Sequence, residues 1–260
     1  MTGPTGGAPA CPVCDSPMTV FDTAVVLDRY PATYHRCGRC GLVATRETPW
    51  LEEAYASAIH DADSGLLRRA RRLSALTGAV IRFEGLRGGR FLDWAGGYGV
   101  FTQLMRDRGL DYWHHDDFAQ PVFARDFQDD GTSRCDLVTA FEVFEHLADP
   151  RRELAHLATR TDRILFTTEL LPEPAPRVGE WWYYLPGVGQ HITFHTVASL
   201  RLLGDHLGYR LTTNGTNWHL FHRAPLDPRT RLLLSTRLND GARALRRTLA
   251  AVRPGRGPAS

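Results

Sequence analysis

The sequence has little of what would place the chain in a membrane, outside the cell or on nucleic acid. None of its apolar runs approaches the roughly 20 residues that a membrane-spanning helix needs. The opening stretch, MTGPTGGAPACPVC, has neither the basic segment nor the apolar segment of a secretion signal, so we expect a cytoplasmic protein. The formal net charge of +2 is too small by itself to indicate nucleic acid or an anionic membrane as a partner.

Charge is unevenly distributed, although its sum is small. Residues 229–256 contain eight arginines and a single acid, Asp240. This pattern predicts a basic, solvent-exposed amphipathic helix with a frayed end over 226–260. The length of 260 residues allows one sizeable α/β domain with small appendages.

Cysteine is scarce and clustered. Four of the five cysteines form two C-x2-C pairs with 22 residues between them: Cys11, Cys14, Cys37 and Cys40. Two such pairs are typical of a tetrahedral zinc site, and we interpret residues 1–46 as a zinc-ribbon module with a strand between the pairs. Two disulfides are the alternative that a reducing cytoplasm disfavours, and a redox site would need only one pair. Cys135 precedes an apolar segment and is expected in the core.

The remaining chain changes its periodicity twice. Residues 47–87 show apolar positions at helical spacing and are interpreted as a helical linker of two helices. From 88 to 225, short apolar segments alternate with amphipathic ones, which predicts an α/β fold with a mostly parallel sheet, helices on both faces and a ligand at the carboxyl ends of the strands. Residues 211–224 contain Asn-Gly and predict a terminal antiparallel hairpin with a tight turn.

A glycine-rich turn follows the first predicted strand of this domain. It reads D-x-A-G-G-x-G over residues 93–99, whereas a nicotinamide-binding turn would read G-x-G-x-x-G. The acid before the turn and the close spacing of the glycines resemble the nucleotide loop of class I S-adenosylmethionine (AdoMet)-dependent methyltransferases. The resemblance implies a Rossmann-like fold in which the turn lines the amino-acid end of AdoMet and Asp93 orients it, with these turn residues: Ala95, Gly96, Gly97 and Gly99. Ala95 stands where the family has its usual first glycine.

Two further motifs follow in the order that this family has. The second predicted strand ends in HHDDF, where the resemblance implies an acid that accepts hydrogen bonds from the ribose hydroxyls of AdoMet. Asp116 lies 17 residues after Gly99, at the expected distance, and Asp117 is its competitor. The segment CDLVTAFEVFEHL resembles the fourth-strand motif of the family, which implies that Phe141 and Glu142 contact the cofactor.

The candidates for catalysis come from the same region and from a long loop. The pair Glu145 and His146, together with the four-cysteine module, is similar to zinc-ribbon-bearing deoxysugar C-methyltransferases, in which such a pair serves acid/base work. Capping of a helix is the structural alternative. The loop 169–196 is rich in proline, glycine and aromatic residues, and long loops in compact domains tend to be functional. Its His191 is a candidate for acceptor positioning or for the base.

The sequence therefore predicts an AdoMet-dependent methyltransferase with a structural zinc ion. The predicted acceptor is a small molecule, possibly a sugar or sugar-like intermediate, because aromatic rings beside polar groups suit a sugar face. We expect no room in this chain for the further C-terminal domain of the deoxysugar enzymes, which argues against C-methylation and leaves O- or N-methylation open. The alternatives are an RNA methyltransferase, against which the modest charge argues, and a non-catalytic AdoMet-binding partner. The sequence predicts no oligomeric state.

Overall fold

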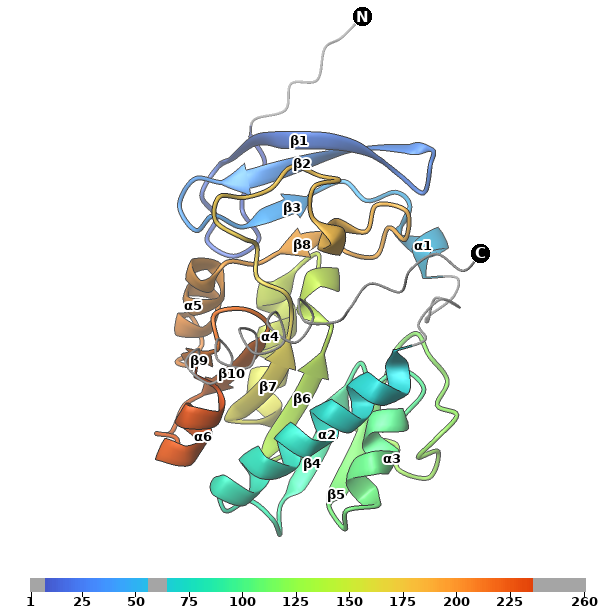
Figure 1. Ribbon diagram of the computed structural model, residues 1–260, viewed down its shortest axis with the longest axis vertical. Helices are drawn as coiled ribbons and strands as arrows, with labels where there is room; N and C mark the ends of the chain where they lie inside the picture. Colours follow the sequence, from blue (N-terminus) through green and yellow to red (C-terminus); the bar gives the residue numbers. More distant parts are fainter. Residues whose placement is uncertain (1–7, 56–64, 236–260) are drawn as a thin grey trace, which may run out of the picture.

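A computed structural model describes residues 8–55 and 65–235, which form two sheets. The larger sheet has the strand order β5-β4-β6-β7-β10-β9 and lies below the smaller one in Figure 1. Its strands are β4 (Arg90–Trp94), β5 (Asp111–His115), β6 (Leu137–Phe141), β7 (Arg163–Thr167), β9 (Arg210–Thr213) and β10 (Trp218–His222). The first four are parallel, and β10 pairs antiparallel with both β7 and β9. The predicted α/β fold and the terminal hairpin are confirmed.

Helices cover both faces of the larger sheet because its buried strands alternate apolar side chains between two cores. Leu73 and Met105 pack with Phe91 on one face, whereas Leu154 and Leu200 pack with Leu92 on the other. The helices are α1 (Leu51–Ala54), α2 (Leu66–Phe83), α3 (Val100–Arg106), α4 (Pro150–Arg160), α5 (Val197–Asp205) and α6 (Pro228–Leu233). The two helices expected in the linker are α1 and α2. Along the part of the chain that the structure describes, no helix has the length and apolarity to cross a membrane.

The smaller sheet joins the N-terminal segment to the long loop after β7. Its order is β1-β2-β3-β8, with β1 (Met18–Val26), β2 (Tyr30–Cys37), β3 (Val43–Thr45) and β8 (Thr193–Phe194). Val43 pairs with Phe194 and Ala44 with Thr193, so the long loop supplies the fourth strand to a sheet that the N-terminal segment begins. In Figure 1 this sheet lies beyond the upward-pointing ends of β6 and β7. The smaller sheet, which we call the ribbon, thus covers the edge of the larger sheet at which a ligand is expected.

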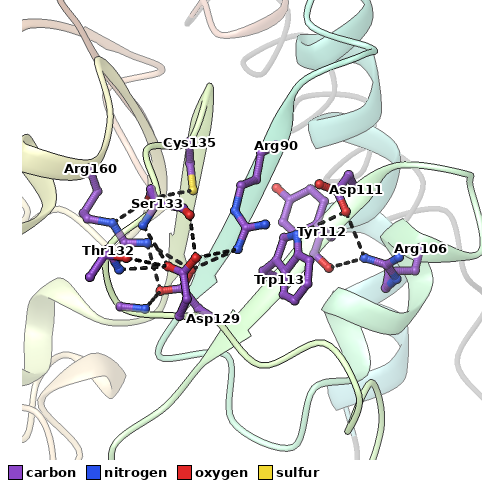
Figure 2. A network of polar contacts seen from close by, with 12 residues as sticks. Arg90, Arg106, Asp111, Tyr112, Trp113, Asp129, Thr132, Ser133, Cys135 and Arg160 are labelled. Atoms are coloured by element: carbon purple, nitrogen blue, oxygen red, sulfur yellow. Dashed lines mark hydrogen bonds and ion pairs between the residues drawn. The ribbon is translucent and has the colours of Figure 1, made fainter.

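The connection after β5 is held down by a buried ion pair, which Figure 2 shows in its polar network. Both Asp129 carboxylate oxygens lie 2.9 Å from Nη2 of Arg160 at the end of α4. The two side chains are only 0% and 3% exposed. The Arg90 guanidinium lies 3.6 Å from the same carboxylate and 4.0 Å from the ring centroid of Trp113. This network fixes the far end of the 116–135 connection, whose near end carries Asp116.

The C-terminal part of the chain differs from expectation in one turn and is described only in part. Residues 214–217 connect β9 to β10, and the Asn214 carboxamide oxygen accepts hydrogen bonds from the backbone N–H groups of Thr216, Asn217 and Trp218. The predicted tight Asn-Gly turn is therefore wrong, because the Asn214 side chain stabilises a longer connection. The basic segment begins with α6, and its part beyond residue 235 lies outside the described residues.

His219 on β10 makes stability depend on pH. Its Nδ1 lies 2.8 Å from the Thr213 hydroxyl and its Nε2 3.0 Å from the Thr168 carbonyl oxygen, and burial lowers its pKa to about 4. The unfolded chain takes up this proton near pH 6.5. We therefore expect His219 to contribute stability above pH 6.5 that is lost as the pH falls towards 4, by up to about 1.4 kcal/mol per pH unit.

Urea unfolding of wild-type protein and His219→Gln between pH 7.5 and 4.5 measures this effect. The free energy of unfolding should fall less steeply with decreasing pH in the variant. The difference between the two slopes should be up to about 1.4 kcal/mol per pH unit, the value for one proton. His206→Gln, at an exposed histidine, is the matched control for the loss of a histidine as such. Equal slopes for His219→Gln and wild type would contradict the expectation.

Candidate active site and cysteine cluster

The four N-terminal cysteines come together at one end of the ribbon. The Sγ atoms of Cys11 and Cys40 lie 3.6 Å apart, those of Cys14 and Cys37 lie 3.5 Å apart, and all four atoms lie within 4.8 Å of one another. A tetrahedral site with Zn–S bonds of about 2.3 Å would have sulfur atoms about 3.8 Å apart. All four side chains are buried and free of disulfides. The donor set and its spacing are therefore compatible with zinc.

Each cysteine pair is shaped by a left-handed residue that follows it. Asp15 has φ 57° and Gly41 has φ 73°. Their backbone N–H groups donate to the carbonyl oxygens of Cys11 and Cys37 at 3.0 Å, which closes each turn around the thiols. The Asp15 carboxylate also receives a bidentate pair from Arg151 on α4 at 2.5 and 2.6 Å. The cysteine cluster is thus fastened directly to the larger domain.

The glycine turn follows β4 at the point where the strand order reverses between β4 and β6, the usual ligand-binding crevice of such sheets. Ala95 has φ 54° and is exposed, so it adopts in this turn a conformation that glycine would adopt without strain. A Cβ on Gly96 would lie 2.4 Å from Asp93 Oδ2, and one on Gly99 would lie 2.4 Å from the Phe123 carbonyl oxygen. These two positions accept no side chain, because the turn packs closely on Asp93 and on the backbone of Phe123.

Asp93 lies beneath this turn as a buried carboxyl group. Its oxygens accept hydrogen bonds from the Thr139 hydroxyl at 3.0 Å and the Thr102 hydroxyl at 3.2 Å. Burial raises its pKa to about 7, and the hydrogen bonds from the two hydroxyls partly oppose this rise. Asp93 therefore contacts the turn from the strand side, in the place from which the sequence predicted that it orients the turn.

Asp116 joins the glycine turn to the connection after β5. Its Oδ2 accepts from the Gly97 N–H at 2.7 Å, and its Oδ1 accepts from the N–H groups of Phe118 and Ala119 at 2.9 and 2.7 Å. Asp117 points elsewhere, pairs with His115 at 3.2 Å and has a side chain that is 71% exposed. Of the two acids, Asp116 is the one that the structure brings to the turn.

Phe141 and Glu142 end β6 at the same edge of the sheet. Glu142 has φ 55°, and its Oε1 accepts a hydrogen bond from the Thr167 hydroxyl at 2.6 Å. The Thr167 oxygen in turn accepts from the Glu142 N–H at 3.0 Å. A non-glycine residue with positive φ at a strand end is a strained feature of the kind that clusters at functional sites. Phe141 packs edge-on against Phe101 of α3, 5.0 Å between ring centroids.

Glu145 is a fully buried acid three residues further on. Its Oε1 accepts a hydrogen bond from the Tyr183 hydroxyl at 2.5 Å, and its buried Oε2 has no hydrogen-bond partner. Burial is the main reason that the pKa of Glu145 lies well above its usual range, and the charge of the nearby Glu142 carboxylate raises it further. An unpartnered buried oxygen is unfavourable in a folded protein.

Two histidines complete a cluster with Glu145. The rings of His146 and His191 lie 4.9 Å apart at 85°, and one ligand atom from each of the three residues lies within 4.8 Å of the others. His191 Nδ1 lies 2.7 Å from the Tyr183 carbonyl oxygen, and His146 Nδ1 lies 2.8 Å from the Tyr55 hydroxyl. Burial lowers the pKa of His146 to about 3 and that of His191 to about 4, so both imidazoles are neutral at pH 7.

The aromatic loop divides into buried and exposed parts. Tyr183 and Tyr184 are buried, and Tyr184 packs against Tyr34 of the ribbon sheet at 5.7 Å between ring centroids. Trp182 is 66% exposed. His195 is buried in the core, with Nδ1 3.2 Å from the Ser199 hydroxyl, and lies outside the histidine cluster. The two tyrosines are therefore core residues, whereas Trp182 lies on the surface.

The structure thus brings the predicted catalytic residues into one cluster and the predicted cofactor residues to one edge of the sheet. Sequence reasoning missed Tyr55 and the role of Tyr183. Tyr55 follows α1, its ring stacks on Phe118 at 5.0 Å and 19°, and its hydroxyl meets His146 across 91 residues of sequence. A single tyrosine in a helical linker gives no local signal of such a contact.

Comparison of the sequence with models of protein families gives one match. The family model described as a methyltransferase domain matches residues 66–214, which is more than half of the chain. The matched segment contains the glycine turn and the acids at the strand ends. It also contains the Glu145, His146 and His191 cluster. A search of curated protein sequences gave no match.

Solved structures give distant similarity. An O-methyltransferase family protein from Burkholderia thailandensis is 15% identical with a TM-score of 0.45, and the match covers 68% of each chain. An O-methyltransferase family 2 protein from Planctomyces limnophilus is 13% identical with a TM-score of 0.40, covering 66% of each chain. Magnesium protoporphyrin IX methyltransferase from Synechocystis, with bound S-adenosylhomocysteine, is 15% identical with a TM-score of 0.40, covering 67% of this chain and 93% of that one.

Proposed function

Because this chain belongs to the methyltransferase-domain family and is a methyltransferase, we propose that it transfers the methyl group of AdoMet to a small polar acceptor at the Glu145, His146 and His191 cluster. The observation that carries this proposal is the position of the cluster. Glu145 and His146 follow β6 at the carboxyl edge of the sheet, next to the strand ends that hold the glycine turn and Asp116. The loop before β8 brings His191 to them. The acceptor class that we propose is a sugar or sugar-like intermediate.

We propose that the cofactor-binding residues are those which the turn and the strand ends bring together. We propose that the backbone from Gly96 to Gly99 lines the charged amino-acid end of AdoMet, and the Asp116 carboxylate suits the ribose hydroxyls. Gly96 and Gly99 let this turn pack closely on Asp93 and on the Phe123 carbonyl oxygen. Ala95 and Gly97 complete the turn, and Asp93 supports it from below. Phe141 and Glu142 complete the proposed set at the end of β6.

Replacing Asp116 by alanine tests the cofactor assignment. The variant loses a carboxylate that accepts charge-assisted hydrogen bonds and that holds the Gly97 N–H. We expect AdoMet binding to weaken by about 2 kcal/mol, which is about 30-fold in Kd. Calorimetric titration with AdoMet measures this change, and Asp117→Ala is the matched control that should bind as wild type does. Unchanged affinity in Asp116→Ala would move the ribose contact to another residue.

We propose His146, Glu145 and His191 as the catalytic residues. In methyl transfer the acceptor atom attacks the methyl carbon, the carbon–sulfur bond breaks with its electron pair going to sulfur, and the acceptor loses a proton. The neutral imidazoles of His146 and His191 offer lone pairs or N–H groups to the acceptor at neutral pH. Glu145 adds an oxygen that is buried and has no hydrogen-bond partner. Together they position the acceptor and promote loss of its proton.

We further propose that the four cysteines bind a structural zinc ion, with no open position for catalysis. The division into a ribbon (1–46), a linker (47–87), a catalytic domain (88–225) and a basic tail (226–260) is part of the proposal. Four thiol ligands suit a reducing compartment, which is the basis for proposing a cytoplasmic protein.

The experiment that tests the function uses purified protein, AdoMet and a panel of nucleotide-linked sugars. Calorimetry should give micromolar AdoMet binding, and a labelled methyl group should pass to at least one acceptor of the panel. Folded protein that binds no AdoMet would overturn the proposal. Binding without transfer to any polar small molecule would favour a non-catalytic partner protein instead.

A further inference from the structure

The Glu145, His146 and His191 cluster has the donor set of a metal site as well as that of an acid/base group. Two imidazoles and one carboxylate, with one ligand atom each within 4.8 Å of the others, match the combination that binds divalent first-row transition metals with positions left open. The cysteine cluster is a separate group with thiol donors only. Nothing about the proposed cofactor explains why three metal-binding side chains converge here.

The second observation is the condition of the Glu145 carboxyl group. Its side chain is fully buried, and Oε2 has no hydrogen-bond partner. Within residues 8–55 and 65–235, no basic side chain forms an ion pair with Glu145. A buried carboxyl oxygen without a partner is unfavourable, and a bound cation would give this oxygen one.

The histidines are oriented as metal ligands usually are. A carbonyl oxygen only accepts, so His191 Nδ1 carries the proton in its 2.7 Å contact with Tyr183, and the lone pair lies on Nε2. The Tyr55 oxygen can accept from His146 Nδ1 in the same way, at 2.8 Å. Metal-binding histidines typically donate their other N–H to such a partner, and the Tyr183 hydroxyl supports the carboxylate at 2.5 Å. Both rings are half-buried.

We propose that Glu145, His146 and His191 bind a divalent transition-metal cation, distinct from the ribbon zinc, which holds the hydroxyl of the acceptor. This inference rests on the proposed function and deepens it. A cation coordinated to a hydroxyl oxygen lowers the pKa of that hydroxyl and fixes the oxygen for in-line attack on the methyl carbon. The proton then leaves to solvent, and the two histidines serve as ligands through Nε2.

Cobalt(II) added to the zinc-containing protein is the probe. After removal of excess metal on a desalting column, elemental analysis should give one cobalt per chain beside the ribbon zinc, with the weak visible absorption of an N/O site. Glu145→Gln and His191→Gln should weaken cobalt binding by more than about 100-fold, beyond the 10- to 100-fold typical of outer-shell changes. His206→Gln, at an exposed histidine, should bind cobalt as wild type does.

Each outcome decides the proposal. Wild-type protein that takes up no cobalt beyond exchange at the cysteines overturns it, and so does cobalt binding that Glu145→Gln and His191→Gln leave unchanged. Circular dichroism shows that the variants are folded, and the isosteric Glu145→Gln keeps the test valid if His191→Gln is not. The readout is metal content, so methyl transfer without a second metal would remove the cation and leave the proposed function standing. A second metal in a protein that transfers no methyl group would leave the cation site standing and remove the proposed function.

Discussion

Replacing His146 by alanine should lower kcat by about a thousandfold while AdoMet affinity stays at the wild-type value. The side chain lies in the cluster with Glu145 and His191 and contacts none of the turn residues through any described hydrogen bond. Loss of a positioned group that promotes proton removal typically costs 10²- to 10⁴-fold in rate, or about 3 to 5 kcal/mol of transition-state stabilisation. The measurement is single-turnover transfer of labelled methyl, with calorimetry of AdoMet on the same protein.

His206→Ala controls for the loss of a histidine as such. His206 follows α5 on the surface, and its removal should leave both kcat and affinity unchanged. A His146→Ala variant with wild-type turnover would remove His146 from the catalytic group. A variant in which AdoMet affinity fell in parallel with kcat would show that His146 supports the cofactor rather than the acceptor.

The second large effect is expected from Cys14→Ser. Loss of one thiolate from a four-cysteine site should release the metal, and structural zinc contributes an apparent free energy of about 10 kcal/mol or more to small modules. The ribbon would then lose its order, and with it the pairing of β3 with β8. Because β8 begins two residues after His191, turnover should be lost together with the metal. Zinc content after dialysis against a mild chelator, and thermal unfolding of the same sample, measure the two effects.

Cys135→Ser is the matched control for this experiment. Cys135 is buried, is not one of the four clustered cysteines, and donates from its thiol to the Ser133 carbonyl oxygen at 3.7 Å. The variant should retain zinc and change stability modestly. A Cys14→Ser protein that kept its metal would refute the four-cysteine assignment.

The parts of the site that are set by local spacing were predictable from the sequence. The two C-x2-C pairs converge because each pair closes its own turn, with Asp15 or Gly41 in a left-handed conformation. Asp116 could be placed because a parallel strand brings its end to the same edge of the sheet as its neighbour. In both cases a short motif in the sequence is enough to predict the contact.

Other parts depend on contacts between distant segments that leave no local pattern. The meeting of Tyr55 with His146 spans 91 residues, and the pairing of β3 with β8 joins Ala44 to Thr193. The aromatic run 181–184 gave no means to tell that Tyr183 would support Glu145 while Trp182 stayed exposed. The Asn-Gly turn failed for a related reason, since the Asn214 side chain competes with the backbone for the same N–H groups.

The shared sheet constrains the order of events during synthesis of the chain. The ribbon cysteines leave the ribosome early, yet the edge of β3 has no partner until β8 emerges about 150 residues later. For that interval the ribbon exposes an unpaired strand edge and the apolar surface that Tyr184 and Phe194 later cover. Early zinc capture would hold the exposed ribbon in shape while the catalytic segment is still being made. A grafted or truncated ribbon would stay in this unfinished state, prone to self-association.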